Sequence, residues 1–105
     1  MATGTFFNAE PQLTVETKNF DNQTATKDTF TAFSWDISKS NFQAIGLVGL
    51  YIANASSSGS NATFLTPYDF HVNISEQKAY LKVRNYSTSN NAKFQVTFYV
   101  LYRRL

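Results

Sequence analysis

Alternation of apolar and polar side chains runs through most of this chain and constrains its fold more than any other feature. Residues 68–74 alternate in this way, and residues 79–83 repeat the pattern after a short polar turn. A period of two residues is typical of a β-strand with one buried and one solvated face. We therefore predict two strands joined as a hairpin. Helix signals are almost missing from the sequence.

Further strands are expected at residues 13–20, 29–37 and 94–103, with polar, turn-forming residues between them. With 105 residues, of which 43% are hydrophobic, the chain can form the core of one domain but not of two. The prediction is an all-β fold, an antiparallel β-sandwich or jelly-roll-like domain of about six to eight strands over residues 12–105. Residues 1–11 are expected to form an N-terminal arm or an edge strand.

Residues 45–53 differ from the other strands because they are apolar on both faces, and residues 98–102 repeat this pattern. A strand of this kind needs cover on both sides, which either a loop or another copy of the protein could supply. We expect a homo-oligomer. Its interface is predicted to use one face of each segment, namely Val48, Leu50, Ile52, Tyr99 and Leu101.

The charge and cysteine content argue against several classes of protein. Charged residues make up 15% of the chain and leave a net charge of +2, whereas nucleic-acid binding needs clustered Lys and Arg. Cysteine is absent, so neither disulfides nor thiolate metal sites hold the fold together. No signal peptide is visible, and the apolar run 44–53 is about half the length of a membrane span. We expect a soluble protein made in a cytoplasm, with no nucleic-acid partner and no membrane partner.

No catalytic constellation stands out in the sequence. The chain has a single histidine, His71, with Asp69 two residues earlier on the same polar strand face. Ser-His-Asp catalysis would need a nucleophile beside the imidazole, and a metal site would need further ligands. The seven carboxylates are scattered without a distinctive pair. We therefore expect a protein that is not an enzyme and that needs no metal and no cofactor.

Exposed tyrosines offer a possible binding chemistry, because rigid β-domains often present aromatic rings that stack on sugars beside polar loop groups. The candidates are Tyr68, Tyr80 and Tyr86, with Asn85 beside them. In a first alternative, the rings only cover the sheet and leave their hydroxyls in solvent. In a second, the mixed aromatic and basic row along residues 80–86 contacts single-stranded nucleic acid or another subunit.

Two stretches, residues 38–49 (SKSNFQAIGLVG) and 79–85 (AYLKVRN) continuing to 100–102, carry a resemblance together with the serine-rich loop 54–61. They resemble a small β module found at the C-terminal ends of structural proteins from bacteriophages and prophages of gut bacteria. The sequence departs from that pattern at Asn41, where Gly is expected, and at Gln43-Ala44 in place of Thr-Pro. The resemblance implies a role on the virion surface, often as a trimer, and it implies no catalytic residue.

The expected function is therefore that of a non-enzymatic bacteriophage virion structural protein, assembled in the cytoplasm of the bacterial host. It would be displayed on the particle as a tail fibre or baseplate tip, or as a head fibre or capsid decoration. Its expected partners are further copies of itself, in a homotrimer, and other virion proteins, with a host cell-surface glycan as a candidate receptor. The alternative is a free-standing carbohydrate-binding module.

Overall fold

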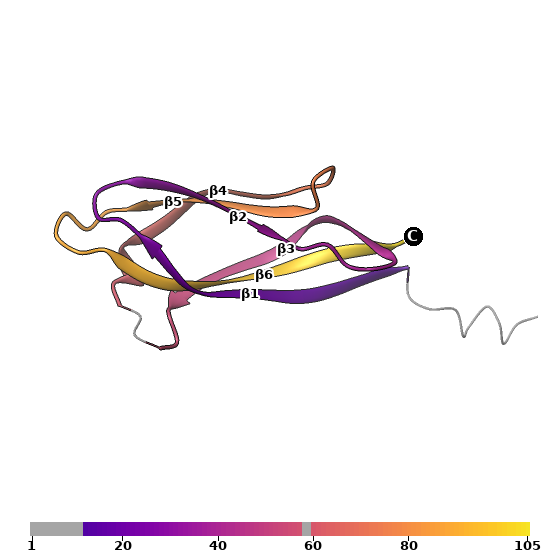
Figure 1. Cartoon of the computed structure of the whole chain (residues 1–105), viewed down its shortest axis with the longest axis horizontal. Coiled ribbons are helices and arrows are strands. Elements are labelled where there is room, and N and C mark those ends of the chain that lie inside the picture. Colours follow the sequence, from indigo (N-terminus) through magenta and orange to yellow (C-terminus); the bar gives the residue numbers. More distant parts are fainter. Residues whose placement is uncertain (1–11, 58–59) are drawn as a thin grey trace, which may run out of the picture.

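The computed structural model describes residues 12–57 and 60–105 of the chain. Its strands form two antiparallel three-stranded sheets, in the orders β1-β6-β3 and β2-β5-β4, which lie one above the other in Figure 1. The expectation for residues 1–11 lies outside the described part of the chain. The elements are β1 (Leu13–Ala25), β2 (Phe30–Asp36), β3 (Phe42–Asn54), the 3-10 helix η1 (Ala62–Phe64), β4 (Leu65–Asn73), β5 (Lys78–Asn85) and β6 (Ala92–Arg104).

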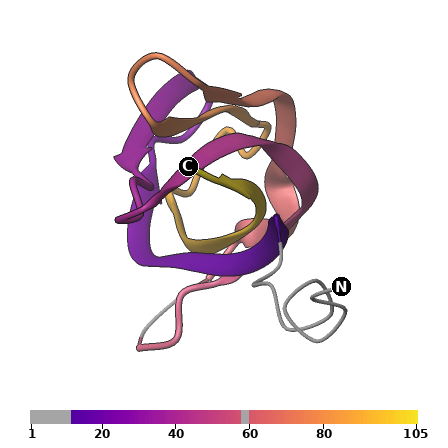
Figure 2. The same cartoon turned by 90° about the vertical axis from the view of Figure 1, so that its right-hand side faces the viewer.

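The predicted all-β character is confirmed, and so is the hairpin at the centre of the sequence. Strands β4 and β5 pair antiparallel from Leu65 opposite Asn85 to Asn73 opposite Lys78. No helix within the described ranges is long and apolar enough to cross a membrane. Viewed end-on, the two sheets wrap around a shared interior (Figure 2).

The core lies between the sheets because the alternating strands turn their apolar faces toward each other. On the central strand β6, the inward side chains Phe94 to Tyr102 are fully buried at every second position, and β5 contributes Leu81 and Val83. Burying one such side chain contributes about 1.5–3 kcal/mol. The inward β6 residues are Phe94, Val96, Phe98, Val100 and Tyr102.

An aromatic stack joins the two sheets. The Trp35 ring of β2 lies between Phe20 of β1, at 4.9 Å between centroids, and Phe33, at 5.5 Å. Phe33 and Trp35 also contact Phe94 and Phe98 of β6, at 5.4 and 5.6 Å. These contacts give the small domain an apolar core that needs no disulfide.

Two bulges in β3 change the faces that alternation predicts for its side chains. The register against β6 shifts between Ala44 and Gly46 and again between Leu47 and Gly49. Each bulge inserts one extra residue, so the side chains after it change face. Leu50 and Ile52 consequently pair with Phe98 and Val96 and pack against the core. They therefore face the other sheet and lie away from the outer face on which Val48, Tyr99 and Leu101 lie.

A third bulge lies in β1, where the sequence predicts a polar loop instead of a continuous strand. Asn22 adopts a positive φ of 59°, and the register against β6 shifts between Phe20 and Gln23. Asn tolerates this left-handed conformation better than most residues. The Asp21 carboxylate accepts hydrogen bonds from the backbone N–H and the hydroxyl of Ser56, so the bulge ties β1 to the loop that follows β3.

Candidate binding surfaces

The sole imidazole has neighbours on the outer face of the β2-β5-β4 sheet. His71 Nδ1 lies 3.3 Å from the Asp69 carboxylate, and the imidazole ring stacks on Tyr80 at 5.2 Å between centroids. Across the described residues, no three Asp, Glu or His side chains converge as metal ligands. The arrangement joins side chains of the paired strands β4 and β5.

Four side chains form a second group on this sheet, which we call the arginine–aromatic cluster: Phe30, Tyr68, Arg84 and Tyr86. The Arg84 guanidinium carbon lies 4.9 Å from the Phe30 ring centroid and 5.4 Å from that of Tyr86. Tyr68 meets Phe30 edge to face at 5.2 Å. The three aromatic residues are between 51% and 64% exposed. Tyr68 and Tyr86 thus lie on one surface, together with Phe30 and Arg84, which were not among the predicted ligand-binding residues.

The strand register explains why these four residues meet. Phe30 begins β2 and lies opposite Arg84 on the central strand β5. Tyr68 lies at a bulge in β4, where the register shifts between Pro67 and Asp69. Tyr86 follows the end of β5. The cluster therefore draws on three neighbouring segments at one end of the sheet.

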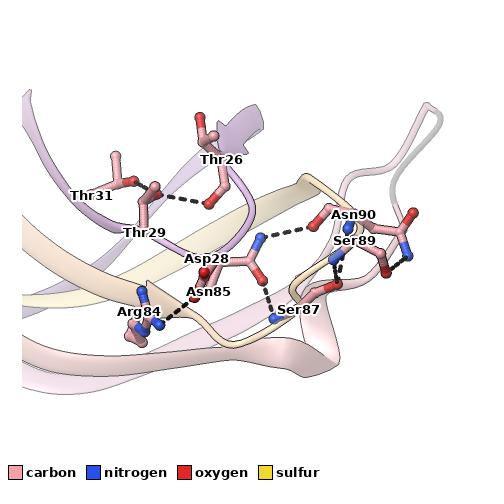
Figure 3. Close-up of polar contacts among 9 residues, drawn as sticks. All are labelled: Thr26, Asp28, Thr29, Thr31, Arg84, Asn85, Ser87, Ser89 and Asn90. Atoms are coloured by element: carbon pink, nitrogen blue, oxygen red, sulfur yellow. Dashed lines mark hydrogen bonds and ion pairs between the residues drawn. The ribbon is translucent and has the colours of Figure 1, made fainter.

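Asp28 completes this end of the sheet through an ion pair. Its carboxylate accepts a hydrogen bond from an Arg84 Nη at 2.6 Å (Figure 3). The backbone of Asp28 has a positive φ of 53°, and its N–H donates to the Ser87 carbonyl at 2.8 Å. The tight turn before β2 is thus fixed against the loop after β5, and it holds the carboxylate beside the Arg84 guanidinium.

Asn85, predicted as a ligand-binding residue, is fully buried and structural. Its side-chain amide donates to the carbonyls of Ala25, at 3.0 Å, and Asn90, at 3.2 Å. Its side-chain oxygen accepts from the Ser87 N–H at 3.0 Å (Figure 3). The prediction fails because Asn85 continues the inward face of β5, on which Leu81 and Val83 lie, so no surface ligand can reach it.

Tyr80, the third predicted tyrosine, lies apart from the cluster. It lies four positions before Arg84 along β5, which corresponds to about 13 Å. Its hydroxyl donates to the Glu76 carboxylate, and this hydrogen bond raises the pKa of Tyr80 above its usual value. With His71 on one face of its ring, Tyr80 has less free area to offer a ligand.

The cations on this outer face are matched by carboxylates. Lys82 lies opposite Asp69 in the register of β5 and β4, and Arg84 pairs with Asp28. Lys78 likewise lies opposite Asp36 on β2. The row along residues 80–86 therefore belongs to an almost neutral surface, which weakens its alternative interpretation as a nucleic-acid contact.

The outer face of the other sheet has a different character. Six of its side chains form what we call the apolar face. Five of them are between 37% and 60% exposed, and Leu101 is half-buried. Leu101 of β6 lies between Val15 of β1 and Gly46 of β3 in the register. The apolar face consists of Leu13, Val15, Val48, Tyr51, Tyr99 and Leu101.

Three of the five predicted interface residues, Val48, Tyr99 and Leu101, belong to the apolar face. Leu13, Val15 and Tyr51 belong to it as well, and they were missed. For Leu13 and Val15 the signal was the apolar side of the β1 alternation, where the opposite side carries Glu16 and Lys18. The register places Glu16 and Lys18 opposite inward residues of β6, so Leu13 and Val15 face outward.

A glycine shapes the middle of the apolar face. A Cβ built on Gly49 would come within 3.1 Å of Cδ2 of Tyr99. The absence of a side chain at this position lets the Tyr99 ring lie close against β3. Gly46 has no atom within 4 Å of the corresponding point, so it leaves open space above the strand.

An open groove of about 440 Å³ lies between β3 and η1. Its lining is uncharged, and it contains none of the residues of the arginine–aromatic cluster. The lining consists of Tyr51, Ile52, Ala53, Asn54, Ala62 and Thr63.

Comparisons with protein-family models, with curated proteins and with solved structures find no match for this chain. The proposed function is therefore based on the chemistry of the two outer faces.

Proposed function

We propose that this chain is a non-enzymatic structural protein of a bacteriophage virion, an oligomeric β-sandwich displayed on the particle. The display site would be a tail fibre or baseplate tip, or a head fibre or capsid decoration. The observation that carries the oligomeric part of the proposal is the apolar face on the β1-β6-β3 sheet. The virion part is supported by the resemblance along residues 38–49 and 79–85.

A second copy of the chain is the occupant that best fits the apolar face. The residues that face outward between Val15 and Asn19 on β1, and between Gln95 and Leu101 on β6, include no charged side chain. The cores of protein interfaces are depleted of charge in the same way, and they are rich in tyrosine. A face without charge can also meet its symmetry mates without repulsion. The module that the sequence resembles is often a trimer.

The composition is compatible with assembly in a bacterial cytoplasm. A cysteine-free chain does not depend on an oxidising compartment. The aromatic stack between the sheets supplies the stabilisation that disulfides supply in many small secreted domains. A displayed virion component needs such stability, because it must persist outside the cell.

Light scattering after size-exclusion chromatography tests the oligomer. The proposal predicts a mass near three times the 11.8 kDa of the chain. Val48→Asp places a charge on the apolar face, where Val48 is 58% exposed, and should reduce the mass to that of one chain. Ile74→Asp is the matched control, because Ile74 is 46% exposed but lies outside this face, in the β4–β5 turn. A wild-type monomer at high concentration would contradict the proposal.

The gene neighbourhood tests the virion part separately. A locus beside capsid or tail genes agrees with the proposal. A locus among polysaccharide-degrading enzymes speaks against it.

A free-standing carbohydrate-binding module is the second candidate, and the arginine–aromatic cluster favours it. Exposed aromatic rings beside an ion pair are chemically suited to a sugar. This candidate differs from the first in predicting a monomer, so the same mass measurement separates the two.

A further inference from the structure

We infer that the arginine–aromatic cluster, together with Asp28, is a binding site for a neutral pyranose ring of a cell-surface glycan. This inference deepens the proposed display on the virion by naming what the displayed domain would bind, and it rests on that proposal for the biological source of the glycan. The site lies on the β2-β5-β4 sheet, whereas the proposed subunit contact uses the β1-β6-β3 sheet. The two can therefore fail independently.

The rings supply the apolar part of the site. Phe30, Tyr68 and Tyr86 are each more than half exposed, although aromatic rings of this size usually gain by burial. The negatively charged face of an aromatic ring attracts positively polarised groups. A pyranose presents C–H bonds polarised in this sense on a face that carries no axial hydroxyl. A flat sugar face therefore matches the rings in both shape and charge.

The ion pair supplies the polar part of the site. Asp28 keeps 57% of its side chain exposed while it accepts from Arg84 at 2.6 Å. A carboxylate has room for several hydrogen bonds, and a guanidinium has five N–H donors. Neighbouring hydroxyls on a sugar both donate and accept, so they can bond to Asp28 and Arg84 together while the ring stacks beside them.

The site is held in position before any ligand arrives. The Lys27 N–H donates to the Asn91 side chain at 2.9 Å, and the Thr29 hydroxyl donates to the Thr26 carbonyl at 2.8 Å. The Asn85 N–H donates to the Thr29 carbonyl at 3.0 Å. The turn that carries Asp28 is thus tied to β5 and to the loop after it (Figure 3). Such preorganisation reduces the entropy that binding would otherwise cost.

The charges on the face favour a neutral sugar over an acidic one. Arg84 is already neutralised by Asp28, and the next cation along β5, Lys82, lies opposite Asp69. An acidic sugar or a nucleic acid would bring its own negative charge next to these carboxylates. A neutral glycan does not meet this repulsion.

The experiment uses the full chain, fluorescently labelled, on an array of neutral and acidic oligosaccharides. The neutral members are built from glucose, galactose and mannose, and the acidic members carry galacturonate or sialic acid. The best neutral oligosaccharide is then titrated by calorimetry, with a thymidine 20-mer as the polyanionic comparison. The inference predicts binding to neutral members and none to the 20-mer. Preference for acidic members or for the 20-mer overturns it, and so does the lack of any neutral ligand.

Point variants locate the site on the protein. Phe30→Ala and Tyr86→Ala should each weaken binding by about tenfold, which corresponds to about 1.4 kcal/mol. Tyr80→Ala is the matched control on the outer face of the same sheet, and it should change affinity by less than about twofold. Circular dichroism confirms that each variant is folded. Equal affinity in wild type, Phe30→Ala and Tyr86→Ala overturns the assignment of the site.

Light scattering on the same samples distinguishes the two levels of the proposal. An oligomer that binds no neutral glycan overturns this inference and leaves the structural role standing. A monomer that binds a neutral glycan through Phe30 supports the site and overturns the oligomeric virion role. A fall in mass for Phe30→Ala would show that a second copy occupies the cluster, which also overturns the inference.

Discussion

The two sheets have the same architecture, but the side chains on their outer faces differ in chemistry. In each sheet a central strand, β6 or β5, pairs antiparallel with two neighbours and buries its inward side chains. On the β1-β6-β3 sheet the outward side chains form the apolar face, and beside it the Asn19 amide donates to Gln95 at 3.1 Å and to Thr97 at 2.7 Å. On the β2-β5-β4 sheet the outward side chains are rings and charges that already engage one another. The first pattern suits a surface that another subunit covers, and the second suits a rigid surface that remains accessible.

The largest effect on stability is expected for Asn85, whose buried side chain lies on the inner side of the β2-β5-β4 sheet. Asn85→Ala leaves the carbonyls of Ala25 and Asn90 and the N–H of Ser87 without this partner. We expect the free energy of unfolding to fall by about 3 kcal/mol, because buried polar groups become unsatisfied. Urea denaturation measures the change.

The same variant sharpens the contrast between the faces. Asn85→Ala should loosen the turn that holds Asp28 and weaken glycan binding, while the mass of the folded fraction stays that of the oligomer. A stability within about 0.5 kcal/mol of wild type would show that Asn85 is not the structural residue described above.

Gly49 tests the apolar face. Gly49→Ala brings a Cβ within 3.1 Å of the Tyr99 ring, which must then move away from the strand. We expect this shift to weaken subunit association by about 1–2 kcal/mol. A dilution series followed by light scattering measures it. Gly46→Ala is the control, because a Cβ there meets no atom within 4 Å. Equal effects of the two substitutions would contradict the close contact between Tyr99 and β3.

Tyr102 gives a pH-dependent prediction for the inner side of the β1-β6-β3 sheet. Its hydroxyl donates to the Ile37 carbonyl, and burial raises the pKa of Tyr102 to about 12, with smaller contributions from Glu16 and Asp36. The folded protein therefore keeps a proton that the unfolded chain loses near pH 10. The stabilisation is complete below pH 10 and is lost as the pH rises from about 10 to about 12.

We expect the free energy of unfolding to fall by about 1 kcal/mol as the pH rises from about 10 to about 12, since solvent screens part of the interaction. Denaturation at several alkaline pH values measures the slope. Tyr102→Phe should remove its share of the slope. An unchanged slope in that variant would contradict the raised pKa.

The smallest effect on stability is expected for Arg84, the charged residue of the arginine–aromatic cluster. Arg84→Gln removes the ion pair with Asp28 and the contacts with Phe30 and Tyr86, yet Asp28 is largely exposed. We expect a loss of about 0.5–1 kcal/mol in stability. Thermal denaturation at low and high salt measures it. Since Arg84 lies away from the apolar face, a change in oligomeric mass would contradict the separation of the two surfaces.

The sequence predicted the parts of the fold that follow from simple alternation. The β4–β5 hairpin and the buried side of β6 follow directly from a period of two residues. The sequence could not predict which β3 side chains face inward. The bulges at Ile45 and Val48 lie within an apolar run, and in such a run the residues are equally compatible with several registers against β6. Single-strand patterns contain no information on such register shifts, which depend on the partner strand.

The candidate sites show the same limit. Tyr68 and Tyr86 were found because exposed rings are conspicuous on a polar strand face. Phe30 was missed because an aromatic residue at the start of an apolar strand is expected in the core. Asn85 was predicted at the surface because its side chain is polar, but it is buried. The sequence of a strand shows which side chains alternate. Which of its two faces is buried depends on the residues that the opposite sheet places over it.

The most direct test of the division between the faces uses four tyrosines as reporters. In a single chain Tyr51 and Tyr99, on the apolar face, and Tyr68 and Tyr86, in the arginine–aromatic cluster, are all between 37% and 60% exposed. Hydroxyl-radical footprinting with mass spectrometry compares their oxidation at low and high protein concentration. We predict that assembly protects Tyr51 and Tyr99 and leaves Tyr68 and Tyr86 unchanged. Equal oxidation of all four at both concentrations, or protection of Tyr68 and Tyr86 alone, would contradict the proposed roles of the two faces.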